Sequence, residues 1–379
     1  MSARSFPNRA TASTRSARVA GFAFAFALVI SGCGSSSTRS GTAERPATSE
    51  GAAPATGAGA AQRAVDARSI EGPSEVADVP AVEAPARPAA PKLPTTVTDV
   101  NGAKVRVTDA QRVIALDLYS TLTDTMIGLG LADRLVGRAG SDTQSILADL
   151  PVVSRDGLEL NTEAVLALHP DLVLTNLTIG SERVYAQLEA AGVTVVRFAE
   201  VPSIADIDAS IHAVGEVFGL AAEADRLAAR TEAELREARA TIASLRRATP
   251  RPPRAIVLYV RGHSGLFFIF GPGYGAADVL DELGLDDVAG DSGITDLAPA
   301  NAESLVGLDP EVILTMADGV ESTGGIEGLL ARPGVAETTA GRHERLVIAG
   351  DNQLLAYGPR TPANLVAVAR AIYTDAASH

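Results

Sequence analysis

The sequence is poor in the residues and motifs on which many enzymes and metal centres depend. Its 379 residues include a single cysteine, Cys33, which argues against internal disulfides, thiolate metal sites and cysteine nucleophiles. It contains no Gly-x-Ser-x-Gly turn, no His-Glu-x-x-His helix and no Walker loop. We therefore expect a protein that is not an enzyme. An extracellular α/β enzyme and a plain interaction domain remain as alternatives.

Positive charge and long apolar runs are also scarce. The formal net charge is −14, and an acidic chain is repelled by nucleic acid and by anionic membrane surfaces. We therefore expect no nucleic-acid partner. The apolar run at residues 19–30 is too short to span a bilayer, which needs about 20 apolar residues.

That short apolar run has the surroundings of a signal peptide. Arginines precede it, and Ser31-Gly32-Cys33 follows its last residue, Ile30. This order resembles the lipobox of bacterial lipoproteins, in which a peptidase cuts before the cysteine and the thiol then carries a diacylglycerol. The resemblance implies a signal peptide at residues 1–33, lipidation of Cys33, and a membrane anchor on the extracytoplasmic face of the cell membrane. A plain secretory peptide and a fortuitous cysteine are the alternatives.

Residues 34–93 are mostly Ala, Gly, Ser, Thr and Pro with scattered charge. Such a segment has too few large apolar residues to build a core, and we predict a disordered tether. Sixty flexible residues have a typical reach of about 40 Å. The tether would hold a folded domain clear of the membrane but close to it.

A repeat organises the rest of the chain. Residues 161–175 and 301–315 align without a gap, and each reads as a short helix, a proline and a buried strand. Residues 129–133 recur in the same way at 283–287. Helix–strand units look alike in many α/β proteins, but two ordered matches predict two related lobes, at residues 94–200 and 251–379.

The remaining patterns give an α/β fold. Alternation on both sides of Asn101-Gly102 predicts a hairpin, and strands that alternate with helices predict a parallel sheet in each lobe. Residues 221–248 read as one long helix within an interlobe segment, 201–250. Its apolar spacing also fits a coiled-coil dimer, but its place between the repeats favours two Rossmann-like lobes joined by one helix, with a ligand cleft between them.

This architecture resembles the substrate-binding proteins of the helical-backbone class, which serve ABC importers of siderophores, cobalamin and haem. Three stretches most resemble the haem-binding lipoproteins of haem importers: Tyr259-Val-Arg261-Gly, Phe270-Gly-Pro-Gly-Tyr and Tyr357-Gly-Pro-Arg360-Thr. The resemblance implies a monomer that carries haem as a transported ligand, not as a catalytic cofactor. Its partner would be an ABC permease dimer with its ATPase. A ferric siderophore or cobalamin is the alternative cargo.

Tyr259 and Arg261 are the main candidate ligand residues. Two positions apart on a strand, they share one face. A cation beside a phenol favours the phenolate, which is a hard anionic ligand suited to ferric haem. Composition alone would make Tyr259 a core aromatic, but the resemblance implies that it is the axial ligand of haem iron and that Arg261 is its partner.

The chain departs from this family pattern at Leu158. The related haem proteins commonly have a histidine there, in the loop before the first repeat helix, and leucine cannot bind iron. Tyr259 then binds the iron alone, or Tyr119 or His263 substitutes, or the ligand is not haem. Arg360 is a further candidate, for a haem propionate, with a solvated loop arginine as the alternative.

Glu163 and Glu303 occupy the same place in the two repeats. They match the pair of glutamates with which proteins of this class dock on arginines of the permease dimer. Acids in the first turn of a helix are also favoured by the helix dipole alone. Their symmetry favours docking, because a two-lobed carrier that meets a two-fold transporter needs matched charges on both lobes.

Overall fold

The computed structural model describes residues 63–155, 158–201, 203–262 and 265–375. Cys33 and His263 lie outside the described residues, so their predicted roles stay predictions. Within the described ranges, no helix combines the length and the apolar character needed to cross a membrane.

The N-terminal lobe is built on a four-stranded parallel sheet in the order β5-β4-β8-β9. Successive residues of β4 point to opposite faces, so that Val113 and Ala115 enter one buried apolar cluster and Ile114 and Leu116 enter another. Burial on both faces is typical of a parallel strand covered by helices. The strands are β4 Val113–Leu116, β5 Leu135–Gly137, β8 Leu172–Thr175 and β9 Thr194–Arg197, and the helices are α1 Thr121–Gly128, α2 Thr162–Ala167, α3 Glu182–Ala190 and α4 Ile207–Val217.

Two small hairpins complete this lobe. The strands β2 (Thr95–Thr98) and β3 (Lys104–Val107) are antiparallel, which confirms the hairpin predicted around Asn101-Gly102. The strands β6 (Ser154–Arg155) and β7 (Glu159–Leu160) form the second hairpin.

The C-terminal lobe holds a seven-stranded sheet in the order β1-β15-β14-β10-β11-β13, with β12 paired to β10. Its centre is parallel, whereas β11 and β13 are antiparallel to their neighbours. The strands are β1 Ser74–Glu75, β10 Arg254–Arg261, β11 Leu266–Phe270, β12 Asp286–Asp287, β13 Leu297–Pro299, β14 Val312–Met316 and β15 Leu346–Ala349, and the helices are α6 Ala276–Leu283, α7 Val288–Asp291, α8 Ala302–Leu308, α9 Ala317–Ser322, α10 Ile326–Leu330, α11 Thr339–Arg342 and α12 Thr361–Tyr373.

The two sequence repeats fold alike, as α2–β8 and α8–β14. Asn161 and Asn301 cap the two helices, because each side-chain oxygen accepts a hydrogen bond from the backbone N–H three residues on. Each helix is followed by a left-handed residue before the proline, His169 with φ 47° and Asp309 with φ 40°. The same local rules therefore end both helices and start both strands.

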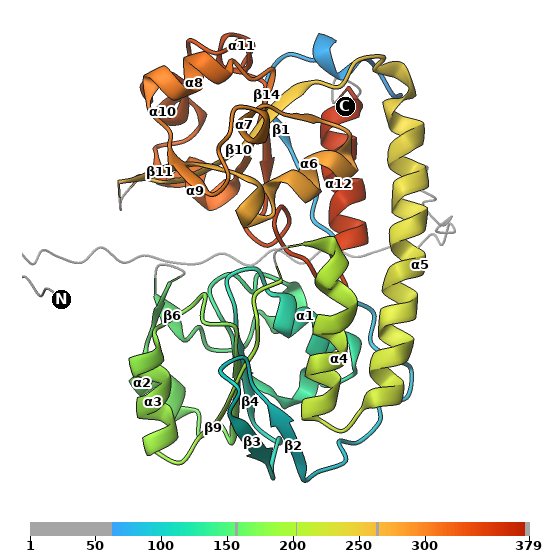
Figure 1. The fold of residues 1–379 in the computed structure, drawn as a ribbon, viewed down its shortest axis with the longest axis vertical. Coiled ribbons are helices and arrows are strands. Elements are labelled where there is room, and N and C mark those ends of the chain that lie inside the picture. Colours follow the sequence, from blue (N-terminus) through green and yellow to red (C-terminus); the bar gives the residue numbers. More distant parts are fainter. Residues whose placement is uncertain (1–62, 156–157, 202, 263–264, 376–379) are drawn as a thin grey trace, which may run out of the picture. The chain divides into compact units, whose positions relative to one another are not determined.

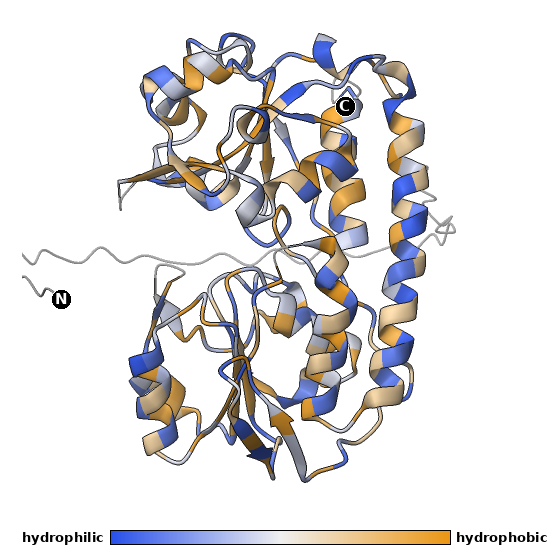
Figure 2. Ribbon diagram, viewed as in Figure 1, coloured by the Kyte–Doolittle hydropathy of each residue, from blue (hydrophilic) through white to orange (hydrophobic). Residues whose placement is uncertain are grey.

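Helix α5 (Ala221–Leu245) serves the cores of both lobes. Leu227 lies in an apolar cluster of the N-terminal lobe, and Leu235 and Ile242 lie in one of the C-terminal lobe. Figure 1 shows α5 beside α4 and beside α12, which it contacts, and Figure 2 shows hydrophilic residues recurring along its length. Because these apolar side chains pack within the chain, the predicted interlobe helix is confirmed rather than a coiled coil.

Residues 63–93, which we call the N-terminal strap, differ from the prediction. Ala67 and Val76 are buried in a core of the C-terminal lobe, and Ser74–Glu75 pairs with β15. Farther on, the Lys92 N–H donates to the Phe218 carbonyl at 2.9 Å. The disordered tether predicted from residue 34 to 93 is therefore wrong for this part. Small apolar and proline side chains cannot build a core, but they can cover cores that other segments have formed.

Candidate functional site

A cavity of about 570 Å³ lies between the two lobes. Most of its lining comes from residues near the carboxyl ends of β4, β10, β14 and β15, which is where ligands bind in open α/β sheets. We call it the interlobe cavity. Its N-terminal wall is formed by Leu118, Tyr119, Gly140, Ser141 and Leu158, and its C-terminal wall by Tyr259, Arg261, Leu266, Met316, Asp318, Glu321, Ser322 and Asp351.

Tyr259 and Arg261 both line the cavity, on the same face of β10. The guanidinium carbon of Arg261 lies 4.9 Å from the ring centroid of Tyr259, within the range of a cation–π contact. The Tyr259 ring also stacks on Phe270, with a centroid distance of 5.4 Å and an interplanar angle of 16°. The ring is thus held by a cation and by a second aromatic.

The electrostatics of Tyr259 are less simple than the sequence predicted. Burial raises the pKa of its phenol, Arg261 opposes that rise, and Asp351 adds to it. Burial prevails, so the side chain without a ligand is a neutral phenol at neutral pH. A further positive charge, such as a metal ion, would favour the phenolate.

Asp351 is a site residue that our sequence reasoning missed. Its carboxylate forms an ion pair with Arg261 and accepts a hydrogen bond from the Asp318 N–H at 3.2 Å. Burial raises the pKa of Asp351, and Arg261 opposes that rise. Asp351 follows the carboxyl end of β15, as Tyr119 follows that of β4, so the strand-end rule contained a signal for it.

The N-terminal wall offers a neutral hydroxyl and apolar groups. The carboxylate of the buried Asp117 accepts hydrogen bonds from the backbone N–H groups of Tyr119, Thr121 and Leu122, at 2.7–2.9 Å, and so fixes the loop that carries Tyr119. Burial also raises the pKa of the Tyr119 phenol above its ordinary value, and the negative charge of Glu200 adds to the rise. Leu158, 41% exposed, lies on the same wall.

Arg360 is placed elsewhere than predicted. It is 5% exposed, does not line the interlobe cavity, and donates from Nε to Asp124 Oδ2 at 3.0 Å. This buried ion pair joins the start of α12 to α1, so it links the two lobes. The prediction that Arg360 contacts a propionate is therefore corrected. Burial raises the pKa of Asp124 to about 6, although Arg360 pulls it down.

Glu163 and Glu303 lie where the repeat placed them, exposed in the first turns of α2 and α8. Neither lines the interlobe cavity. Among the described residues, no cluster of three or more His, Cys, Asp or Glu side chains is suited to hold a metal ion.

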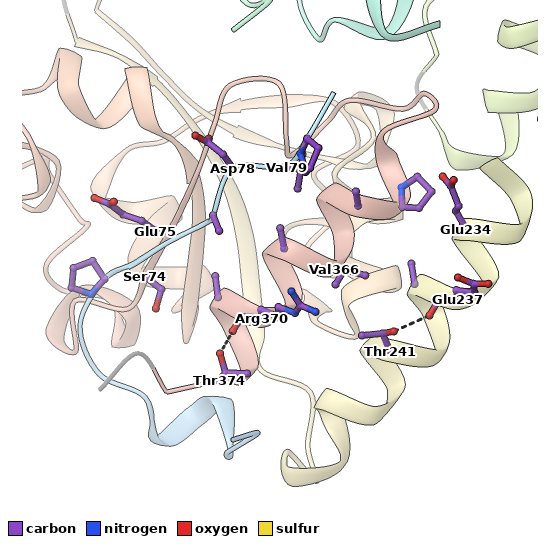
Figure 3. A pocket seen from close by; sticks show the side chains of 18 residues that line it. Ser74, Glu75, Asp78, Val79, Glu234, Glu237, Thr241, Val366, Arg370 and Thr374 are labelled. Carbon is purple, nitrogen blue, oxygen red and sulfur yellow. Dashed lines mark hydrogen bonds between the residues drawn. The ribbon is translucent and has the colours of Figure 1, made fainter. Parts of the chain in front are cut away.

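A second hollow, of about 740 Å³, lies between the N-terminal strap, α5 and α12. Figure 3 shows Arg370 in it, with Glu75, Asp78, Glu234 and Glu237 spread over its rim. Much of the remaining lining is proline, alanine and valine. Although it is larger, this hollow lacks the aromatic and paired charged groups of the interlobe cavity, which we take as the candidate ligand site.

The chain is similar in sequence to a known protein family and to individual proteins. Residues 115–353 match the family described as "Periplasmic binding protein". The chain is 25% identical over 286 residues to an uncharacterized ABC transporter substrate-binding lipoprotein, YvrC of Bacillus subtilis, covering 75% of this chain and 87% of the relative. It is 29% identical over 288 residues to a cobalamin-binding protein of Halobacterium salinarum, covering 74% of each chain.

Solved structures are also similar. The heme binding protein HmuT is 43% identical, with a TM-score of 0.78 over 82% of this chain and 100% of that one. The periplasmic heme-binding protein RhuT of Roseiflexus sp. RS-1 is 30% identical, with a TM-score of 0.63 over 70% of this chain and 98% of that one. HmuT has also been solved with a tyrosine, a histidine or an arginine replaced by alanine, and that tyrosine and arginine are two positions apart.

Proposed function

Because the chain belongs to the periplasmic binding protein family and is similar to ABC-transporter substrate-binding proteins, we propose that it is a lipid-anchored haem-binding protein. It captures haem in the interlobe cavity and delivers it to an ABC importer permease, whose ATPase supplies the energy. The protein itself catalyses no reaction.

One observation carries the haem assignment. Tyr259 and Arg261 face the interlobe cavity with their side chains in contact, and they have the two-residue spacing of the tyrosine and arginine replaced in HmuT. A tyrosine oxygen is a known ligand of ferric haem iron. The positive charge of the iron supplies the pull toward the phenolate that Arg261 alone does not achieve against burial.

The two walls take different parts in this proposal. Tyr259 is the axial ligand in this proposal, and Leu158 on the opposite wall cannot bind iron. Tyr119 keeps its proton because burial raises its pKa, so it offers a hydroxyl rather than an anionic ligand. The leucines at 118, 158 and 266 suit the apolar faces of a porphyrin.

The proposal also covers anchoring and docking. A diacylglyceryl group on Cys33 would keep the protein on the extracytoplasmic face of the cell membrane. Glu163 and Glu303 would contact arginines on the two halves of the permease. The matching exposed positions of these acids in the two repeats support this docking mode.

Cobalamin is the alternative cargo that a specific observation favours, because the relative from Halobacterium salinarum is a cobalamin-binding protein. A ferric siderophore is a further alternative within the same class. Neither requires Tyr259 as a metal ligand, so the effect of a Tyr259 substitution separates both from haem.

The test is a titration of the purified protein with hemin, cyanocobalamin and a ferric siderophore, followed by absorption. We expect hemin alone to bind, with a sharpened Soret band, and Tyr259→Phe to weaken binding about 100-fold. Tyr274→Phe is the matched control, because Tyr274 belongs to the same aromatic stack but is 42% exposed and outside the cavity lining. Retention of cyanocobalamin, or unchanged hemin binding by Tyr259→Phe, would contradict the haem assignment.

A further inference from the structure

Arg261 is held in place from several sides. Its guanidinium is paired with Asp351, lies 4.9 Å from the Tyr259 ring centroid and donates to the Val260 carbonyl at 3.1 Å. An arginine side chain has several rotatable bonds, and ordering it costs conformational entropy. Of these three contacts, only the ion pair joins Arg261 to a different strand, because Asp351 follows β15 and Arg261 ends β10.

Asp351 is itself anchored. One of its carboxylate oxygens pairs with Arg261, and the other accepts the hydrogen bond from the Asp318 N–H. Its side chain is 12% exposed and that of Arg261 is 22% exposed, so solvent screens this pair less than a surface pair. Asp351 therefore presents a fixed anion to a flexible cation.

The other charged residues of the interlobe cavity could draw Arg261 away from Tyr259 if Asp351 did not hold it. Among the described residues, Arg261 is the one basic residue that lines the interlobe cavity, whereas Asp318 and Glu321 line it as well. A guanidinium freed from Asp351 would be attracted to either of those acids and away from the tyrosine. Asp351 thus decides which of the carboxylates Arg261 faces.

We propose that Asp351 is a positioning residue for ligand binding, which holds the Arg261 guanidinium over the ring of Tyr259 and acts on the ligand only through Arg261. This inference rests on the proposed function, because the ligand used to test it is haem. It adds a third residue to the Tyr259–Arg261 pair and connects the ligand site to the end of β15.

A double-mutant cycle with hemin as the probe tests the proposal. We expect Asp351→Ala to weaken hemin binding about tenfold and to shift the visible absorption bands that report on the iron's axial ligand. In an Arg261→Ala background, we expect Asp351→Ala to change the affinity less than about twofold. Glu232→Ala is the matched control, since it removes a carboxylate that pairs with an arginine, Arg236, outside the cavity lining, and it should leave the affinity within about twofold of wild type.

Asp351→Asn separates the two contacts of Asp351. The amide oxygen can still accept from the Asp318 N–H but has no charge with which to hold Arg261, so hemin binding should weaken in this variant too. Full wild-type affinity in Asp351→Asn or Asp351→Ala would overturn the proposal, as would independent, additive losses in the double variant. The thermal midpoint of each variant shows whether it is folded.

The outcomes distinguish this inference from the proposed function. If the wild-type protein does not bind hemin, the haem assignment itself fails. If the wild type binds hemin and Tyr259→Phe loses it, while Asp351→Ala binds as the wild type does, only the role of Asp351 fails.

Discussion

The two walls of the interlobe cavity come from equivalent parts of related lobes, yet they carry different chemistry. Leu116 in β4 pairs with Thr175 in β8, and Leu258 in β10 pairs with Thr315 in β14. Because Thr175 and Thr315 occupy the same place in the repeat, the residues that follow the two leucines, Asp117 and Tyr259, are equivalent.

At this equivalent position the two lobes diverge. Strand β4 stops, and the Asp117 carboxylate accepts hydrogen bonds from the N–H groups of Tyr119 and of the first two residues of α1, Thr121 and Leu122. Strand β10 continues, paired with β11 through Tyr259↔Phe268, and so carries Tyr259 and Arg261 to the cavity. A four-residue and an eight-residue strand thus give one wall a structural acid and the other the proposed ligand residues. Related scaffolds position the cavity, but a single lobe supplies most of its charge.

The largest effect should come from breaking the contact that links the lobes. Replacing Arg360 with methionine leaves the buried Asp124 carboxylate without its cation, and loss of one partner of a buried pair costs about 3–5 kcal/mol. We expect the free energy of unfolding in urea to fall by that amount. Arg236→Met, which removes an exposed pair with Glu232, should cost less than about 0.5 kcal/mol. Equal effects of the two substitutions would show that the buried Arg360–Asp124 pair contributes no more to stability than an exposed ion pair.

A second effect concerns Asp142, which lies next to Ser141 of the N-terminal wall. Burial, with a contribution from Asp117, raises the pKa of Asp142 to about 7, above its ordinary value of about 3.9. The folded state therefore binds more protons between about pH 4 and 7, and its stability falls as the pH rises through that window. Asp124, with a pKa of about 6 beside Arg360, Gln144 and Asp117, acts in the same direction.

We therefore expect Asp142→Asn to raise the free energy of unfolding at pH 8 by on the order of 2 kcal/mol and to flatten its dependence on pH. Urea unfolding at pH 5 and pH 8 is the measurement. As a comparison, Asp149→Asn, at an exposed position, should leave the slope unchanged. The same slope in Asp142→Asn as in the wild type would exclude Asp142 as its source.

A third prediction concerns a substitution that gives the N-terminal wall a group able to bind iron, as the C-terminal wall already has. Leu158→His would give the N-terminal wall an imidazole that can bind iron opposite Tyr259, and we expect hemin affinity to rise about tenfold, or about 1.4 kcal/mol. The spectrum should change to that of a six-coordinate complex. Val152→His is the control, because Val152 is exposed but outside the cavity lining. An unchanged spectrum in Leu158→His would mean that the ligand does not sit between these walls.

The smallest effect on ligand affinity should come from the exposed acids that the lobes share. Glu163 and Glu303 lie outside the cavity lining. In the variants Glu163→Gln and Glu303→Gln, hemin affinity should therefore stay within about twofold of wild type, or about 0.4 kcal/mol. Haem-dependent stimulation of the permease's ATPase should instead fall, and fall most in the double variant. Stimulation unaffected by both changes would count against the docking role.

Much of the fold could be predicted because its signals are local. The helix caps at Asn161 and Asn301, the prolines after both helices and the Asn101-Gly102 turn each determine structure within a few residues. The same locality placed Tyr259 and Arg261 on one strand face. Strand-end reasoning also brought Tyr119 to the cavity.

The failures of sequence reasoning have a common physical cause. The prediction that Arg360 contacts a ligand failed because its partner, Asp124, is 236 residues away in the sequence. The N-terminal strap was predicted to be disordered because its composition suits no core of its own, whereas it packs on cores made by other segments. The strand-end position of Asp351 was a local signal, but its role depends on the contact with Arg261, 90 residues away in the sequence. In all three cases, contacts between residues far apart in the sequence determine the structure.

The central claim is that Tyr259 binds the iron of haem in the interlobe cavity. Resonance Raman spectroscopy of the ferric hemin complex tests it most directly, because vibrations of an iron-bound phenolate appear only when a tyrosine oxygen is a ligand. We predict these bands in the wild-type protein and in Tyr119→Phe, and their loss in Tyr259→Phe. Their absence from the wild-type complex, or their persistence in Tyr259→Phe, would contradict the claim.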